Sequence, residues 1–176
     1  MQRVVEDLIS LSRIEAQKFT ALTDAIDLRP LIEQAAENAR LMAAERNSTI
    51  VRLIEPRLPP IAADSGQILQ LLDNLIANAR RYTDAPGHVR VELSRAADGA
   101  RLIVEDTAPG VPQAALPRLF ERLYRVEESR SRAAGGAGLG LAICQAIVEA
   151  HQGRIEAAPS RLGGLRITID LPGGGE

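Results

Sequence analysis

Residues 135–148 read Gly135-Gly-Ala-Gly-Leu-Gly140-Leu-Ala-Ile-Cys-Gln-Ala-Ile-Val148, a glycine cluster that leads directly into an apolar helical pattern. Glycines at a helix start expose the first backbone N–H groups, and the helix dipole favours an anion there. A triphosphate is therefore a natural ligand. A Walker A loop would need Gly-Lys-Ser/Thr, but the only lysine is the distant Lys18. A dinucleotide fingerprint would need G-x-G-x-x-G, whereas the spacing here is G-x-G-x-G.

A second informative stretch is the helix predicted over residues 66–82, which an Asp and a Ser precede as candidate caps. Asn74, Asn78, Arg81 and Tyr82 are spaced by four, three and one residues, so they lie along one polar side of this helix. An asparagine carbonyl is a hard oxygen ligand for Mg²⁺, and an arginine suits phosphate. Taken alone, the pattern also fits two surface asparagines.

The third stretch is a loop that opens with Asp106, directly after the strand predicted over residues 101–105. A carboxylate at this position can accept a hydrogen bond from an exocyclic amine such as that of adenine. Gly110, at the end of the loop, lets the backbone turn and approach a ligand closely. A turn-forming aspartate is the alternative for this loop alone.

The remaining patterns predict an α/β (α+β) two-layer sandwich with a mixed sheet of about five strands and three main helices. Strand signals occur at residues 25–28, 49–54, 89–93, 101–105, 154–157 and 165–171. Helical patterns occur at residues 31–46, 66–82 and 141–150. Residues 1–20 predict one further helix of the bundle type, whose apolar stripe must pack on another helix.

Composition bounds the function. A chain of 176 residues accommodates one domain and an appended element. Aromatic residues make up only 2% and the net charge is −2, which argues against nucleic-acid binding. Cys144 is the only cysteine and is expected to be a buried, inert thiol. The chain shows no signal peptide and no long apolar run, so we expect a cytoplasmic location, with a membrane-bound parent left open.

In this order and at this spacing, the motifs resemble those of the sensor histidine kinases, whose ATP-binding domain is shared with gyrase, heat-shock 90 and mismatch-repair ATPases. Residues 74–82 are similar to the N box, 106–110 to the G1 box, 119–125 to the F box and 136–140 to the G2 box. Residues 120–172 are particularly similar to the envelope-stress sensor kinases of the BaeS type. The resemblance covers almost the whole chain.

The resemblance implies two parts, because residues 7–15 are similar to the second helix of the family's dimerisation and phosphoacceptor hairpin. Residues 1–22 would be this part of the hairpin, and residues 23–176 would be the ATP-binding catalytic domain. The parent would be a homodimer anchored in the bacterial inner membrane.

The resemblance also implies the ligands, which are ATP and Mg²⁺. Asn78 would bind the metal and Asp106 the adenine amine, and residues 125–135 would form a mobile lid. The other implied nucleotide contacts are Arg81, Tyr82, Gly110, Gly136, Gly138, Leu139 and Gly140. Arg122 and Arg125 would contact phosphate, unless they are solvated lid residues. Thr168 would fix adenine through a water molecule, unless it is an ordinary strand threonine.

The implied activity is phosphoryl transfer to a histidine and thence to an aspartate of a response-regulator receiver domain. In the hydrolytic relatives a glutamate activates water at the position that Asn74 occupies, and an amide lacks the basicity for that step. Asn74 and Asn78 are therefore the expected catalytic residues of a transferase. The phosphoacceptor box, a histidine followed by an acidic residue, does not occur, and His88 and His151 are expected to be local structural residues. The acceptor would lie on a phosphoacceptor helix of the same or a partner kinase chain.

One departure keeps an alternative open. The G1 box usually reads Asp-x-Gly-x-Gly, and here Ala108 replaces its first glycine. A degenerate nucleotide-binding and dimerisation module, which signals without phosphoryl transfer, is therefore the alternative function. The serine-kinase regulators of sigma factors share the fold but have no reason to carry a helix at residues 1–20.

Overall fold

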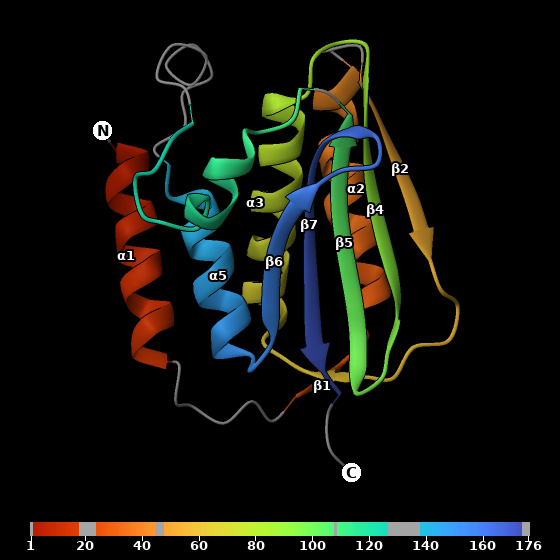
Figure 1. The fold of residues 1–176 in the computed structure, drawn as a ribbon. Helices are drawn as coiled ribbons and strands as arrows, with labels where there is room; N and C mark the ends of the chain where they lie inside the picture. The colour runs from red at the N-terminus through yellow and green to blue at the C-terminus, as the bar shows by residue number, and fades with distance from the viewer. Residues whose placement is uncertain (1, 18–23, 45–47, 108, 127–137, 174–176) are drawn as a thin grey trace.

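The computed structural model describes residues 2–17, 24–44, 48–107, 109–126 and 138–173 (Figure 1). The helices are α1 (Gln2–Gln17), α2 (Leu28–Ala44), α3 (Ser65–Tyr82), the 3-10 helix η1 (Gln113–Arg118) and α5 (Gly140–Ala150). The strands are β1 (Ala25–Ile26), β2 (Ser48–Ile54), β3 (Ile61–Ala62), β4 (Gly87–Ala96), β5 (Gly99–Thr107), β6 (Arg154–Pro159) and β7 (Gly163–Pro172).

A five-stranded sheet with the order β2-β4-β5-β7-β6 forms one layer. β2 runs parallel to β4, and the other neighbouring strands are antiparallel, so the sheet is mixed as predicted. α2, α3 and α5 form the second layer over one face, and α1 packs against α5 on the side away from the sheet (Figure 1). β1 and β3 pair separately as a short two-stranded ribbon.

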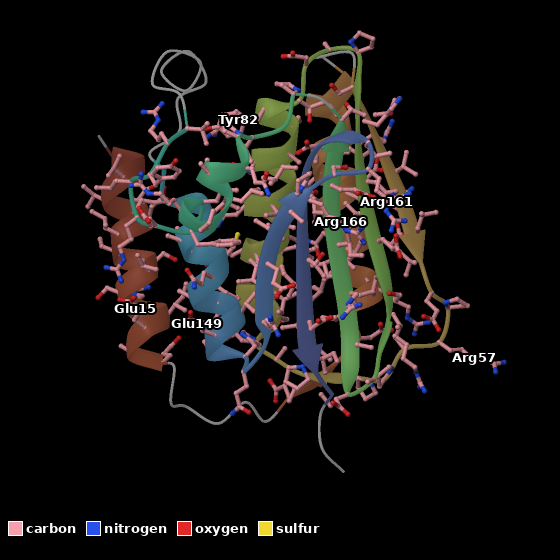
Figure 2. The ribbon with its side chains drawn as sticks, in the orientation of Figure 1. Glu15, Arg57, Tyr82, Glu149, Arg161 and Arg166 are labelled. Atoms are coloured by element: carbon pink, nitrogen blue, oxygen red, sulfur yellow. The ribbon has the colours of Figure 1, made fainter. Side chains whose placement is uncertain are left out.

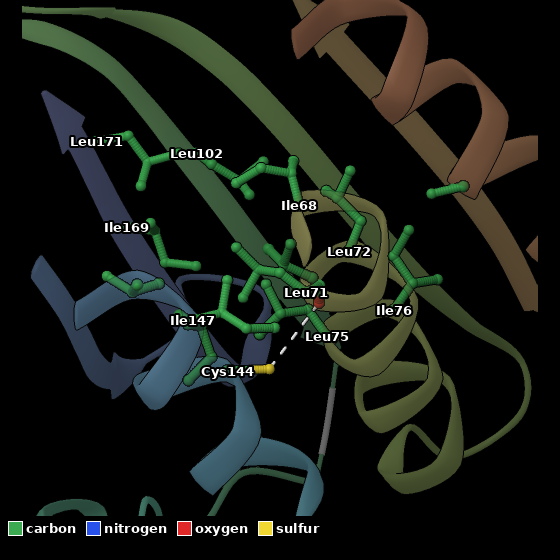
Figure 3. Packing of buried hydrophobic residues seen from close by; sticks show 14 of the residues in the cluster. Ile68, Leu71, Leu72, Leu75, Ile76, Leu102, Cys144, Ile147, Ile169 and Leu171 are labelled. Carbon is green, nitrogen blue, oxygen red and sulfur yellow. Dashed lines mark hydrogen bonds between the residues drawn. The ribbon is translucent and has the colours of Figure 1, made fainter. Parts of the chain in front are cut away.

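The core lies between the sheet and the helices. Residues of β4 alternate between buried and partly exposed along the strand, so that Val89, Val91 and Leu93 face the helices. They belong to one hydrophobic cluster with the aliphatic side of α3 and the buried side of α5. Figure 3 shows how residues of α3, α5, β5 and β7 pack in this cluster. The Cys144 thiol is fully buried here, 3.9 Å from the carbonyl oxygen of Leu71. The opposite face of the sheet carries polar residues such as the Arg101–Asp170 ion pair.

The N-terminus of α3 confirms the predicted cap, because the Asp64 carboxylate accepts the N–H of Gln67 at 2.9 Å. α2, by contrast, begins at Leu28 rather than at residue 31, and the strand predicted over 25–28 is only two residues long. The cause is Asp27, whose carboxylate accepts the N–H of Arg29 at 3.0 Å and so satisfies a donor of the first turn.

β3 was not predicted, because it is a two-residue strand directly after two prolines and depends on its pairing with the distant β1 and on a bridge from Ile61 to Gly173. The boundary between residues 22 and 23 lies outside the described residues, so the division into two domains stays a prediction. Within the described part of the chain, no helix combines the length and the apolar character needed to cross a membrane.

Candidate functional site

Four segments that are far apart in the sequence meet at one end of the molecule. They are the C-terminal half of α3, the end of β5, the N-terminus of α5 and the turn between β6 and β7, which lie toward the top in Figure 1. Tyr82, the last residue of α3, marks this end in Figure 2. The three motifs of the sequence therefore belong to one region of the structure.

α3 presents its amides and cations on the side that does not enter the core. Asn74, Asn78 and Arg81 are half-buried, and Tyr82 is exposed. The Asn74 side-chain nitrogen Nδ2 is buried and has no hydrogen-bond partner among the described residues. A buried amide nitrogen without a partner is costly, which makes it a candidate for contact with a ligand or an ordered water.

Asp106 is a buried carboxylate on the helix-covered face of the sheet. It pairs across the strands with Val89, which faces the helices, and only 4% of the residue is exposed. Its Oδ1 accepts the N–H of Leu165 at 2.8 Å. Burial raises the pKa of Asp106 to about 7, although the hydrogen bond from Leu165 acts in the opposite direction and the nearby Glu105 charge adds to the rise.

A β-bulge brings Leu165 to Asp106. The pairing of β5 with β7 shifts between Glu105 and Thr107, so that two residues of β7 lie opposite Asp106. The glycine before Leu165 permits this approach, since a methyl group added at Gly164 would lie 1.9 Å from Asp106 Oδ1. Gly110 packs over the same turn, where an added methyl group would lie 3.2 Å from the carbonyl oxygen of Gly164. Sequence reasoning missed Gly164 and Leu165, although the Gly163-Gly164 pair that begins β7 was an available signal.

The N-terminus of α5 has the open geometry that its glycines suggest. Gly138 has the left-handed φ of 74°, and its carbonyl oxygen accepts the N–H of Leu123 at 2.9 Å. Leu139, the N-cap residue, is fully buried and anchors the helix start in the core. A methyl group added at Gly140 would meet no atom of the described residues within 4 Å. As far as the described part of the chain goes, the first turn of α5 therefore borders free space.

Two predicted phosphate contacts have different surroundings. Arg122 is exposed and forms an ion pair with Glu15 of α1. Arg125 is half-buried, and two nitrogens of its guanidinium, Nε and Nη2, are buried without a partner among the described residues. A buried cation is stable only when it is paired, so Arg125 fits an anionic ligand better than Arg122 does in this conformation.

Thr168 is not brought to the site. It pairs with Ile103 of β5, whereas Asp106 lies three residues further along that strand and on the opposite face. The expected role of Thr168 next to adenine is therefore corrected, because the alternation of β7 directs it away from the helices. Ala108, Gly136 and most of the expected lid lie outside the described residues.

The oxygen ligands limit the kind of metal site that can form. No cluster of three His, Cys, Asp or Glu side chains suitable for a metal occurs among the described residues. Asn78 offers a single amide oxygen. Mg²⁺ keeps several waters and uses few protein ligands when phosphates supply the others, so this set fits a metal that arrives with a nucleotide.

Comparison with known proteins places this arrangement in a family. The sequence model described as "Histidine kinase-, DNA gyrase B-, and HSP90-like ATPase" matches residues 63–174. The signal transduction histidine-protein kinase BaeS of Escherichia coli (strain K12) is 41% identical over 172 residues, which cover 98% of this chain. This chain spans only 37% of that protein.

Solved structures agree with the sequence comparisons. The structure of full-length ShkA in complex with AMPPNP has 31% sequence identity and a TM-score of 0.81. The match covers 97% of this chain and 35% of that chain. The mycobacterial sensor histidine kinase MprB is 27% identical with a TM-score of 0.74, over 85% of this chain and 98% of that chain. The two-layer fold and the expected resemblance are confirmed.

Proposed function

The chain belongs to the histidine kinase-, DNA gyrase B- and HSP90-like ATPase family, and from that premise we propose that it donates the γ-phosphoryl group of Mg·ATP to a histidine. That histidine lies on a segment absent from these 176 residues. A response-regulator aspartate would then receive the group. The chain would thus be the catalytic part of a sensor histidine kinase.

The observation that carries the proposal is the convergence of the polar side of α3, the buried Asp106 and the open N-terminus of α5. The three elements supply complementary chemistry: amide oxygens for a metal, an acceptor for the adenine amine and a helix dipole for phosphate. The ShkA structure holds AMPPNP, an adenine nucleotide, which supports the same class of ligand here.

The residues around the phosphates favour transfer over hydrolysis. Asn74 lies one turn before Asn78 on α3, where a carboxylate would be needed to take a proton from water. Phosphoryl transfer asks mainly for positioning and for neutralisation of charge. Asn78 would hold Mg²⁺ when the nucleotide is bound. The two guanidinium nitrogens of Arg125 that lack a partner among the described residues would contact phosphate. Nothing in the comparisons favours the alternative of a module without phosphoryl transfer.

α1 supports the proposed dimeric parent. Leu11 and Ile14 are buried, while Val5, Leu8 and Ile9 are 45–55% exposed on another side of the same helix. A helix with two apolar sides can dock on the catalytic domain with one and enter a helical bundle with the other. The two apolar sides of α1 therefore support a homodimeric parent with a phosphoacceptor helix. The proposal also includes an inner-membrane anchor in the parent chain, on the strength of the similarity to BaeS.

A nucleotide titration tests the proposal. Asn78→Ala removes the proposed metal ligand, so the affinity for ATP should fall about tenfold with Mg²⁺ and change little with EDTA. Asn38→Ala, an exposed asparagine of α2, is the control and should bind as the wild type does. Equal Mg·ATP affinity of the wild type and Asn78→Ala would refute the metal assignment, and no ATP binding by the wild type would refute the function.

A further inference from the structure

Directly behind Asp106, on the face of the sheet away from the helices, lies a second carboxylate that is completely buried. Glu105 is 0% exposed, although this face carries mainly solvated charges. Its neighbours across the strands are Arg90 of β4 and Arg166 of β7. The guanidinium of Arg90, which is itself partly exposed, forms an ion pair with it. Figure 2 shows Arg166 and Arg161 in the half of the sheet that ends at the β6–β7 turn.

Glu105 is tied to that turn through Ser160. The Ser160 hydroxyl donates a hydrogen bond to Glu105 Oε2 at 3.1 Å and accepts the N–H of Leu162 at 3.0 Å. Backbone bonds close the turn, from the Gly163 N–H to the Ser160 carbonyl at 3.1 Å and from the Ser160 N–H to the Gly164 carbonyl at 2.9 Å. The hydroxyl of one serine therefore connects the buried carboxylate to the whole turn.

The same turn delivers the backbone that contacts Asp106. Gly164 and Leu165 form the bulge opposite Asp106, and the Leu165 N–H reaches its Oδ1 at 2.8 Å. Gly164 has no room for a side chain, because an added methyl group would lie 1.9 Å from Asp106 Oδ1 and 2.5 Å from the carbonyl oxygen of Thr107. Two consecutive residues, Glu105 and Asp106, thus hold the turn from opposite faces of the sheet.

We propose that Glu105 is a positioning residue for nucleotide-base recognition, acting through Ser160 and the β6–β7 turn on the Leu165–Asp106 hydrogen bond. The inference rests on the proposed function, since it concerns the residue expected to accept the adenine amine. The orientation of Asp106 decides how well an amine is preferred to the carbonyl that guanine presents at the same place. Loosening of the turn therefore lowers base selectivity more than it lowers phosphate or metal binding.

The cost of burying Glu105 supports a positioning role. The Glu105 carboxylate loses all of its hydration while Arg90 stays partly exposed, so their attraction has to offset the full desolvation cost of the carboxylate and adds little net stability. The exposed Arg101–Asp170 pair on the same face has no such cost and makes no contact with the turn. Glu105, unlike Asp170, lies where it can transmit a constraint to the site.

The first test needs no nucleotide. Ser160→Ala removes the hydroxyl link with little change in volume, so hydrogen exchange of the Leu165 amide should accelerate about tenfold. Ser160→Thr keeps a hydroxyl and should restore slow exchange. Asp170→Asn, which breaks the other ion pair of this face, is the control and should leave the Leu165 amide unchanged. Unchanged exchange in Ser160→Ala would overturn the link.

The second test measures dissociation constants for ATP and GTP. Ser160→Ala and Glu105→Gln should each lower the ATP-to-GTP preference about tenfold, whereas the effect of Mg²⁺ on ATP affinity should stay at its wild-type value. A general loss of stability would weaken both nucleotides equally. In a double-mutant cycle, Ser160→Ala should have no further effect on selectivity once Asp106 is alanine.

The outcomes separate the two proposals. Wild-type selectivity in both Ser160→Ala and Glu105→Gln would overturn the positioning role while the proposed function stands. A wild-type chain that binds no ATP would overturn the proposed function and base recognition with it, whatever the exchange experiment shows. Accelerated Leu165 exchange together with reduced ATP preference would support both.

Discussion

Asp106 illustrates at the scale of one residue how a ligand-binding group costs stability. Its folded-state pKa of about 7 lies above the ordinary value of 3.8, mainly because the carboxylate is buried. Between these two values the folded chain binds more protons than the unfolded chain. The contribution of Asp106 to the free energy of unfolding therefore falls as the pH rises from about 4 to about 7.

We expect Asp106→Asn to be more stable than the wild type at pH 8, by roughly 1–3 kcal/mol, and to lose this advantage at pH 5. Urea unfolding at the two pH values measures the difference. Asp170→Asn is the control with the opposite sign. The Arg101 guanidinium lowers the pKa of Asp170, so its small contribution is present at pH 8 and is lost as the pH falls. A wild-type advantage over Asp106→Asn at pH 8 would contradict the burial argument.

Cys144, unlike Asp106, is buried within the hydrophobic core and not at the proposed ligand site. Desolvation raises the pKa of the thiol far above its ordinary range, so almost no thiolate is present near neutral pH. We expect a disulfide reagent at pH 8 to label Cys144 only at the rate of global unfolding. Labelling in urea, which should be complete within minutes, is the control. Rapid labelling of the native chain would show that the helix layer opens locally at this point.

At the scale of elements, the glycines of the site have two roles. Some allow a backbone conformation or a close backbone contact, and others leave room for the proposed phosphate groups. Gly140→Ala adds a methyl group at the first residue of α5, where no atom of the described residues lies within 4 Å. Alanine favours helix over glycine by up to about 1 kcal/mol, so thermal stability should stay the same or rise. Affinity for ATP should nevertheless fall about tenfold, because the methyl group enters the proposed phosphate space.

Gly164→Ala is the contrasting variant. Its added methyl group would lie 1.9 Å from Asp106 Oδ1, so the bulge must move and both stability and ATP affinity should fall. Thermal melting and a nucleotide titration of the two variants separate the classes. If Gly140→Ala is stable and its affinity for ATP is unchanged, the proposed phosphate site at the start of α5 is refuted.

The elements that the sequence predicts well are those whose signals are local. The Asp64 cap, the aliphatic stripe of α3 and the apolar run of α5 each fix an element without knowledge of its neighbours. β3 and the bulge at Gly164 depend on pairing with distant strands, so the sequence alone could not give them. The face of Thr168 follows from the register of β7, and one register fixes every side chain of the strand.

At the scale of the whole molecule, α1 packs on the rest of the described chain through a small apolar contact and through polar contacts that include those of Ser10, Glu15 and Gln17. Leu11 and Ile14 are 2–3% exposed. The Gln70 side-chain amide donates to the Ser10 hydroxyl at 2.8 Å, the Gln67 side-chain amide donates to Gln17 Oε1 at 3.2 Å, and Arg122 pairs with Glu15. Three of the residues that hold α1 therefore belong to α3 or to the segment that leads to Arg125.

We expect Leu11→Ala to weaken the docking of α1 by about 2 kcal/mol or more, because it leaves a cavity in a buried contact. Leu8→Ala, at a position that is 45% exposed, is the matched control and should have almost no effect. Hydrogen exchange of the α1 amides reports docking without requiring global unfolding. Equal protection of α1 in the two variants would show that the helix is held by its polar contacts alone.

The positions of the two histidines decide what the isolated chain can do with ATP. His151 is buried directly after the last residue of α5, at the end where Figure 2 labels Glu149. The 11 residues of α5 place it about 16 Å from Gly140. Its Nδ1 lies 2.7 Å from the Ile147 carbonyl oxygen, and its Nε2 accepts the Asp64 N–H at 3.1 Å. His88 lies on the sheet face away from the helices, with Nδ1 2.6 Å from the Thr49 hydroxyl. Neither imidazole can meet a γ-phosphate held at α5.

The 176-residue chain, incubated with labelled ATP, should therefore bind nucleotide yet acquire no stable phosphohistidine. Transfer requires near in-line contact of the reacting atoms, and a misplacement of about 1 Å can lower its rate on the order of a hundredfold. Hydrolysis should also be slow, because Asn74 cannot act as a base. A longer chain that supplies the N-terminal helix and its histidine should become labelled, and the label should be lost in acid as expected for a phosphoramidate. Replacement of that histidine by alanine should abolish the label, whereas His88→Ala should not. Robust labelling of the 176-residue chain that disappears in His88→Ala or His151→Ala would place the acceptor within these residues and would overturn the separation of donor and acceptor proposed here.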